Sequence, residues 1–393
     1  MAGRSDGLRP GHGAYLRATV ALFFLGIAAF SQLYTVQPLL VTIGAEFRVG
    51  AGETSWLMSA ATAGIAVAVL PIGHYSGRFG RRRTMLVGLA LATAAGVVLT
   101  LLHSWPLLIA IRALQGVALS TVLVSAMAWV VASAHPLAVT RLGGLYISGT
   151  SIGGMTGRLV AGFAAELGTW RTGVLTATVV AAVCGGIAHL LLPGSEVYEE
   201  RTADERGEDP YRRVRLTMYV TGALGMAVFV GIFNVMSYRM AGPPFHVGTA
   251  VTSLLFLTYL AGTWTSAIAG RISARFGLRR SLVLGIGACA LGILTTLTPS
   301  VPVLIGGLVI LCAGFFLAHA LASASAAAYA PRPSAASSRY SLAYYAGSAL
   351  GGVVLGYAWE GAGWTGTVTG ALGMLALVVV VIVATPTPPR PIR

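Results

Sequence analysis

The chain has 393 residues, of which 56% are hydrophobic and 10% charged, and its mean hydropathy is +0.79. A soluble domain of this length does not need so much apolar surface for its core, so the composition indicates a protein that crosses a bilayer several times. The net charge of +14 comes from arginines that lie mostly in short breaks between apolar tracts. That pattern reflects membrane topology and excludes a nucleic-acid partner.

Each apolar tract is long enough for one spanning helix, because about 20 residues cross roughly 30 Å of hydrocarbon. We expect twelve helices, at residues 18–42, 53–75, 82–103, 106–133, 140–166, 171–192, 214–240, 249–271, 279–298, 302–329, 338–361 and 364–385. Residues 193–213 hold seven of the twelve acidic residues and are too short and too charged to fold alone. The predicted fold class is an all-α membrane protein, with a six-helix bundle at 1–192, a charged linker at 193–213 and a second bundle at 214–393.

The arginines also predict the orientation of these helices. With the N-terminus inside, 21 of the 26 arginines lie in inner segments, whereas three lie at the other face. The positive-inside rule therefore places the linker and both termini in the cytoplasm, and the protein in the cytoplasmic membrane. The first apolar stretch is too long for a signal peptide and no small-residue cleavage site follows it, so it is interpreted as the first span.

The two halves of the chain repeat each other. The loop at 73–83 and the loop at 270–280 share the pattern G-x-x-S-x-R-F-G-x-R-R at an offset of 197 residues. The glycine-rich stretches at 146–154 and 344–352 match at an offset of 198. Two matches at nearly the same offset indicate a duplicated six-helix unit, in the parallel arrangement whose substrate site lies between the halves near mid-membrane.

The first loop resembles the Major Facilitator Superfamily signature G-x-x-x-D-R-x-G-R-R, and this resemblance covers essentially the whole chain. The resemblance implies gating roles for Gly73, Arg78, Gly80, Arg81 and Arg82, and for Gly270, Arg275 and Gly277 in the second copy. The family's Asp is replaced by Gly77 here and by Ala274 in the second copy. The latch between the halves is therefore expected either to rest on Arg78 and Arg275 bonding carbonyls at helix C-termini or to be weaker than in the family. The alternative is that these arginines serve only topology and contact lipid head groups.

The fourth and fifth spans resemble drug/proton antiporters of the same superfamily. Arg112, Gln115 and Gly116 fit R-x-x-Q-G, and the stretch 149–158 is close to G-x-x-x-G-P-x-x-G-G. It differs at two of its positions, and it supplies further gating candidates: Gly153, Gly154, Gly157 and Arg158. The alternative role of these glycines is close helix packing. The resemblance, which extends to bacterial sugar- or drug-efflux permeases, implies export.

Amide side chains are confined to the predicted membrane. The single asparagine, Asn234, and all three glutamines lie in spans, which inverts the usual surface preference of amides. In the superfamily the first and seventh spans line the central cavity. Tyr34 and Gln37 on the first are expected at the depth of Asn234 and Tyr238 on the seventh, where they can form a band that contacts a polar solute. The alternative is hydrogen bonding between helices without a ligand.

The positions of ionisable residues limit the possible proton carriers and the charge of the solute. No carboxylate is expected in mid-membrane, so the candidate proton carrier is His319 on the tenth span, although a hydroxyl such as Ser323 can also satisfy it. Arg112, Arg158 and Arg239 are expected in the outer half, where they form an electropositive vestibule. The alternative for Arg112 and Arg239 is that they snorkel to the outer surface or pair with Glu46, Glu166 or Glu360. The predicted solute-binding residues are Tyr34, Gln37, Arg112, Gln115, Asn234, Tyr238, Arg239 and His319. Organic cations are disfavoured because no buried carboxylate holds them.

Function is narrowed to three classes. No phosphate-binding loop or His/Cys/Asp ligand cluster occurs, so we expect no enzyme, cofactor or metal site. The leading hypothesis is a monomeric secondary transporter that exports a small polar or amphiphilic solute, neutral or anionic, in exchange for protons, with membrane lipids as its other partners. The alternatives are an uncoupled facilitator or importer of a neutral or anionic metabolite, and a receptor or scaffold that kept the fold without transport.

Overall fold

The fold is taken from a computed structural model, which describes residues 8–9, 13–194, 209 and 211–386. Within these residues the structure is helical and contains no strand, which confirms the predicted fold class. A helix pairs its backbone polar groups within one segment, as hydrocarbon requires. The helices are α1 (Gly13–Tyr34), η1 (Gln37–Leu39), α2 (Leu40–Phe47), α3 (Ala51–Phe79), α4 (Arg81–Leu101), α5 (Trp105–Ser133), α6 (Pro136–Glu166), α7 (Trp170–Leu191), α8 (Arg212–Ala241), α9 (Thr249–Ser253), η2 (Leu254–Thr258), α10 (Tyr259–Phe276), α11 (Leu278–Thr295), α12 (Val301–Ala328) and α13 (Pro333–Ala384).

The predicted spans correspond to helical segments of the described chain. Ten segments are long and apolar enough to cross a membrane. The helix α6 has 31 residues, and α13 bends at Ala362 and Gly363 into two arms that match the last two predicted spans. The first predicted span is not one continuous helix. The helix α1 ends at Tyr34, and the short helix η1 that follows contains Pro38, which has no backbone N–H to continue the helical hydrogen bonds.

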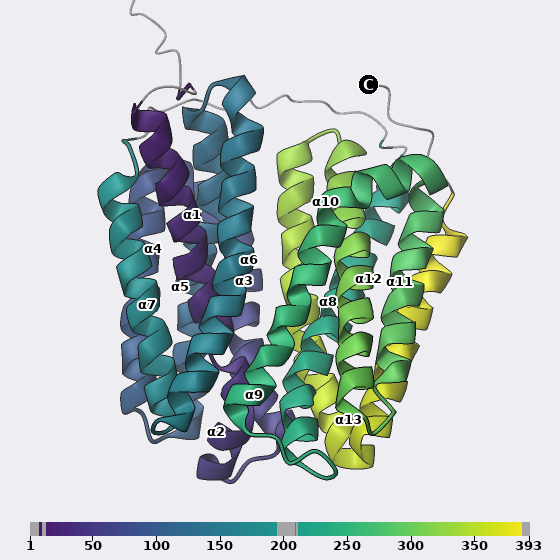
Figure 1. The fold of residues 1–393 in the computed structure, drawn as a ribbon. Coiled ribbons are helices and arrows are strands. Elements are labelled where there is room, and N and C mark those ends of the chain that lie inside the picture. Colours follow the sequence, from purple (N-terminus) through teal and green to yellow (C-terminus); the bar gives the residue numbers. More distant parts are fainter. Residues whose placement is uncertain (1–7, 10–12, 195–208, 210, 387–393) are drawn as a thin grey trace, which may run out of the picture.

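The helices form two groups that lie side by side. Figure 1 shows α1 to α7 on one side of the molecule and α8 and α10 to α13 on the other, with the short helix α9 between them next to α6. We call the end at which α1 begins and α7 and α13 end the linker face, and the other end the opposite face. The division into bundles joined by residues 193–213 stays a prediction, because 195–208 and 210 of that linker lie outside the described residues.

Glycines of the repeat pack the same way in both halves. An added Cβ at Gly153 would lie 2.6 Å from the Cα of Ile27, and one at Gly351 would lie 2.2 Å from the Cα of Ala227. These positions therefore bring α6 against α1 and α13 against α8 at distances that any side chain would prevent. Gly157 lies equally close to α1, so the geometry favours the packing role for this stripe.

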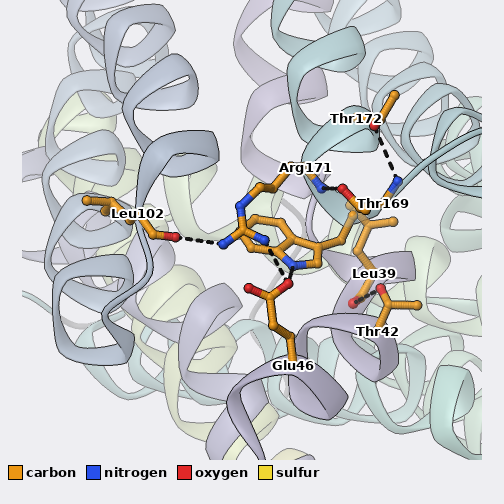
Figure 2. Close-up of polar contacts among 8 residues, drawn as sticks. Leu39, Thr42, Glu46, Leu102, Thr169, Arg171 and Thr172 are labelled. Carbon is orange, nitrogen blue, oxygen red and sulfur yellow. Dashed lines mark hydrogen bonds and ion pairs between the residues drawn. The ribbon is translucent and has the colours of Figure 1, made fainter.

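The opposite face of the first group is held by one polar cluster. Figure 2 shows Arg171, at the start of α7, donating to Glu46 at 2.7 Å and to the carbonyl of Leu102 at 2.9 Å. The indole of Trp170 donates to the same Glu46 oxygen at 2.6 Å. Glu46 therefore bonds to α7, and it is not the partner of Arg112 or Arg239 that the sequence had suggested.

Candidate functional site

The most unusual charge in the described structure is Arg158, which is 1% exposed and lies between the two groups of helices. Its Nε donates to Gln37 Oε1 at 2.7 Å, and its Nη1 donates to the Gly154 carbonyl one turn earlier at 2.8 Å. Its Nη2 donates to the Tyr259 hydroxyl on α10 at 3.3 Å. Among the residues that the structure describes, no carboxylate forms an ion pair with it.

Three aromatic rings complete the surroundings of this guanidinium. Its Cζ lies 3.9 Å from the ring centre of Tyr34, 4.6 Å from that of Phe256 and 4.7 Å from that of Tyr259. Tyr34 ends α1, whereas Phe256 and Tyr259 come from η2 and α10 in the second half. The charge is therefore stabilised by ring faces and neutral hydrogen-bond acceptors from both halves.

The hydrogen bonds of Arg158 continue into an amide pair across the interface. Gln37 Nε2 donates to Asn234 Oδ1 at 2.8 Å, and both side chains are fully buried. The amide orientations follow from the charge: an arginine donates only, so the atom of Gln37 facing it must be oxygen, and the nitrogen then faces Asn234. We call Arg158, Gln37, Asn234 and Tyr259 the Arg158 network.

The Arg158 network ends in a donor without a partner. Asn234 Nδ2 has no hydrogen bond, and neither does the buried Ser59 Oγ. Both atoms lie beside Gly352, where an added Cβ would be 2.8 Å from Asn234 Nδ2 and 3.1 Å from Ser59 Oγ. A buried unsatisfied donor costs about 1–3 kcal/mol, so Asn234 Nδ2 is placed to donate a hydrogen bond to an oxygen of a solute or of water.

Gln37 and Asn234 are equivalent positions of the repeat. They are 197 residues apart, the same offset as the duplicated loops, so the bond between them lies on the pseudo-symmetry axis of the fold. Both were predicted as neighbours across the interface, and the structure brings them together. Arg158 was expected as a gating residue of its glycine-rich span and as one cation of an outer vestibule, but not as a neighbour of the two amides. The shared repeat offset of Gln37 and Asn234 is the sequence signal that could have predicted their contact.

The other two members of the predicted band have different positions. Tyr34 stacks on Arg158, whereas the Tyr238 hydroxyl lies 2.7 Å from Thr54 Oγ1 and donates to the Leu40 carbonyl at 3.1 Å. Tyr238 therefore joins α8 to α2 and α3 near the opposite face. Arg158 and Asn234 lie seven or eight residues before their helices end, which is about 12 Å at 1.5 Å per residue. Arg158 and Asn234 therefore lie about halfway between the middle of their helices and the ends at the opposite face.

Arg112 and Gln115 lie inside the first group of helices. Arg112 is 1% exposed and donates to the Gln32 carbonyl at 3.3 Å, the Leu33 carbonyl at 2.8 Å and the Leu57 carbonyl at 2.9 Å. Carbonyls 32 and 33 are those that the break after Tyr34 leaves without helical partners. Gln115 Oε1 accepts a fourth bond at 2.6 Å. The pairing of Arg112 with an outer carboxylate was wrong, because the ends of α1 take its donors.

Arg239 occupies a similar position in the second half. It donates to the Thr296 carbonyl at the end of α11 at 2.6 Å, and its Cζ lies 4.8 Å from the ring centre of Trp364. It too has no carboxylate partner among the described residues, because Glu166 accepts from the backbone of Ala250 and Glu360 from that of Gly52. The expected pairing of Arg239 with an acid was therefore wrong.

His319 lies among aromatic rings on α12. Its Nδ1 is 2.8 Å from the Tyr340 hydroxyl, and its ring stacks on Phe315 with centres 5.8 Å apart. The ring centre of Tyr344 lies 4.7 Å from that of His319. The hydroxyl that meets it comes from α13 rather than from Ser323, because Tyr340 reaches across the helix interface.

The repeated loops at the linker face do not join the two halves. Arg78 and Arg275 are exposed and contact the rings of Tyr75 and Phe276 near the C-terminal ends of their own helices, α3 and α10. Their neighbours Arg82 and Arg279 instead donate to carbonyls at the ends of α7 and α13, within their own halves. Gly80 and Gly277 have φ of 84° and 82°, a turn that only glycine adopts without strain.

Hydrogen bonds between the halves gather near the opposite face. They include the Gln37–Asn234 and Arg158–Tyr259 bonds, and the backbone of Gly52 and of Ala250 donates across the interface to Glu360 and Glu166, respectively. At the linker face, by contrast, an added Cβ at Gly77, Gly80, Gly270 or Gly277 would meet no atom within 4 Å. The described conformation is closed at the opposite face. The described residues include no group of three metal-ligating side chains.

Comparison with known proteins places this arrangement in a family. A family model described as the Major Facilitator Superfamily matches residues 22–256. The inner membrane transport protein YnfM of Escherichia coli (strain K12) is 35% identical over 381 residues, which are 95% of this chain and 90% of that protein. A bacterial homologue of the human lysosomal transporter Spinster, solved in an inward-facing and occupied conformation, superposes with a TM-score of 0.73 at 15% identity and covers 96% of both chains. The nucleoside transporter NupG superposes with a TM-score of 0.72 at 14% identity over 94% of this chain and 98% of its own.

Proposed function

Since the chain belongs to the Major Facilitator Superfamily and is a multi-pass membrane transporter, we propose that it carries a small organic anion across the cytoplasmic membrane by alternating access. Arg158 is the proposed charge partner of the solute, and Asn234 supplies a second hydrogen bond. The linker face is the cytoplasmic face, as the arginine distribution predicts. The described conformation is then the one that is open toward the cytoplasm.

The observation that carries this proposal is the burial of Arg158 without a carboxylate. A buried cation costs several kcal/mol, and charges inside a membrane protein are retained where they serve function. Its bond to Gln37 Oε1 uses a neutral acceptor. A solute carboxylate or phosphate adds Coulomb attraction and can bind the guanidinium through two parallel bonds, so it competes well with the neutral amide for the same donors.

The same exchange links binding to the conformational change. When a solute anion takes the guanidinium from Gln37, the amide pair with Asn234 loses the charge that polarises it. The bond of Arg158 to Tyr259 is exchanged as well, and these are contacts that hold the two halves together at the opposite face. Binding from the cytoplasm therefore weakens the closure on the far side, as alternating access requires.

We propose export as the direction, on the basis of the antiporter-like glycine stretch in α6, with His319 as the proton carrier. His319 is the histidine of α12 and meets the Tyr340 hydroxyl, which gives it a proton-transfer partner inside the second half. Proton entry from outside the cell then resets the carrier after the solute has left.

The test is counterflow of labelled solutes in proteoliposomes, with a panel of organic anions, sugars and neutral antibiotics. Anions are expected to exchange, and Arg158→Gln is expected to weaken their apparent affinity about ten- to hundredfold, because bonds to charged groups contribute about 1.5–3 kcal/mol. The matched control is Arg48→Gln, which removes an exposed arginine at the same face. Exchange of sugars or neutral compounds alone, or equal kinetics in both variants, would contradict the anion proposal.

One observation favours a second candidate, an uncoupled facilitator. The carboxylates among the described residues of the helices, such as Glu46, Glu166 and Glu360, all lie near the opposite face, so none can carry a proton through mid-membrane. An imposed pH gradient separates the two candidates. Accumulation against a solute gradient supports the coupled exporter, whereas equilibration at every pH difference supports the facilitator.

A further inference from the structure

The three rings around Arg158 have the geometry of a site for a free organic cation. Tyr34, Phe256 and Tyr259 place their ring centres 3.9–4.7 Å from one guanidinium carbon. Proteins that bind quaternary ammonium or guanidinium ligands use such sets of aromatic faces, because the negative face of each ring attracts a cation. We call these three side chains the aromatic cage.

The aromatic cage is supported by a second layer of rings that does not depend on Arg158. Phe233 stacks on Phe256 with ring centres 5.4 Å apart and meets Tyr259 edge-on at 4.9 Å. Phe229 lies 5.0 Å from Tyr259 and 5.1 Å from Phe233. Packing of this kind fixes rotamers, so two walls of the cage are expected to stay in place when the arginine side chain is removed.

The hydrogen-bond acceptors around the aromatic cage also fit a guanidinium group. Gln37 Oε1, the Gly154 carbonyl and the Tyr259 hydroxyl each accept from a different nitrogen of Arg158. An alanine at this position lacks Cγ, Cδ and the guanidinium group. Ethylguanidinium contains the same groups, and it therefore fits the space and meets the same three acceptors.

We propose that Arg158 is a tethered occupant of an organic-cation site, and that its presence keeps free organic cations out of the transport path. The side chain fills the aromatic cage with a cation that cannot leave, so the site offers positive charge to a solute rather than ring faces. The exclusion of cations in transport rests on the proposed function, whereas the cage itself does not.

The experiment measures ligand binding to the purified full-length protein in detergent, with Arg158→Ala as the variant. Ethylguanidinium at millimolar concentration is expected to raise the Tm of Arg158→Ala saturably and to leave the wild type unchanged. Ethylammonium and sodium chloride at the same ionic strength control for charge alone, because they lack the planar group. Adding Tyr34→Leu to Arg158→Ala removes one wall, and the ligand affinity is expected to fall about tenfold.

Several outcomes would overturn the inference. Ethylguanidinium that shifts the Tm of wild type and Arg158→Ala equally, or an affinity unaffected by Tyr34→Leu, would show that the rings do not form a cation site. If Arg158→Ala does not fold, Arg158→Met and Arg158→Lys replace it. A caged cation predicts that the lysine variant stays closer to the wild-type Tm than the methionine variant, and the reverse order would contradict the cage.

Failure of this inference can be distinguished from failure of the proposed function. Anion counterflow by the wild type, together with no ligand binding to Arg158→Ala, would reject the cage and retain the anion transporter. Saturable binding that depends on Tyr34, in a protein whose wild type exchanges no anion, would retain the cage and reject the anion transporter. Restoration of anion counterflow in Arg158→Ala by ethylguanidinium would support both.

Discussion

Replacing Asn234 by alanine tests whether the amide pair at the pseudo-symmetry axis holds the opposite face closed. The change removes the 2.8 Å bond from Gln37 and leaves the Gln37 Nε2 donor buried without a partner. Hydrogen bonds between membrane helices average about 0.6 kcal/mol, but a stranded donor costs about 1–3 kcal/mol. Because Gln37 is also polarised by Arg158, we expect the substitution to destabilise the closed conformation by about 2 kcal/mol relative to the open one. That free energy lowers the ratio of closed to open protein about thirtyfold.

The population shift can be measured by distance spectroscopy between spin labels on the two halves. Ala45 and Val251 are exposed positions near the opposite face, on α2 and α9, and cysteines there carry the labels. Asn234→Ala is expected to broaden the distance distribution toward longer values and to raise the apparent KM for the solute, while Tm changes little. Ser237→Ala is the matched control, because its hydroxyl donates only a long 3.3 Å bond to the Gln37 backbone. Unchanged distances and unchanged transport kinetics in Asn234→Ala would refute the role of the amide pair.

The remaining predictions concern the linker face, the proton carrier and the buried arginine of the first half. Replacing both Arg78 and Arg275 by alanine is expected to favour the state open at the linker face, because these side chains are exposed in the described conformation and can join the two halves only when that face closes. Distances between spin labels across that face that do not change would mean that the two arginines serve only topology. The change His319→Gln is expected to abolish pH-driven accumulation while downhill exchange persists, and pH-driven transport that survives it would place the coupling group elsewhere. Substituting Arg112→Met is expected to lower Tm, because three backbone carbonyls lose their donor at about 1 kcal/mol or more each, and a normal Tm with weakened solute binding would instead place Arg112 in the solute site.

The sequence by itself determined the membrane class, the positions of the apolar helical segments and the internal repeat. Apolar length and the arginine-rich breaks carry that information, because a bilayer selects helices by length and places arginine at one side. The glycine stripes were also readable, since close approach of two backbones admits only glycine, as at Gly153 and Gly351. The pairing of Gln37 with Asn234 was within reach as well, because buried amides are rare and these two share the repeat offset.

Only the tertiary structure decided which way each helix faces. Lipid and protein interior are both apolar, so a spanning helix such as α12 is hydrophobic all round and its sequence does not mark the buried side. For that reason Arg112, expected at an outer cavity, turns into its own half to satisfy the carbonyls at the end of α1. Arg158, with an equally plain sequence context, turns to the interface, because the rings and acceptors that stabilise its charge come from helices of both halves and meet only in the folded chain.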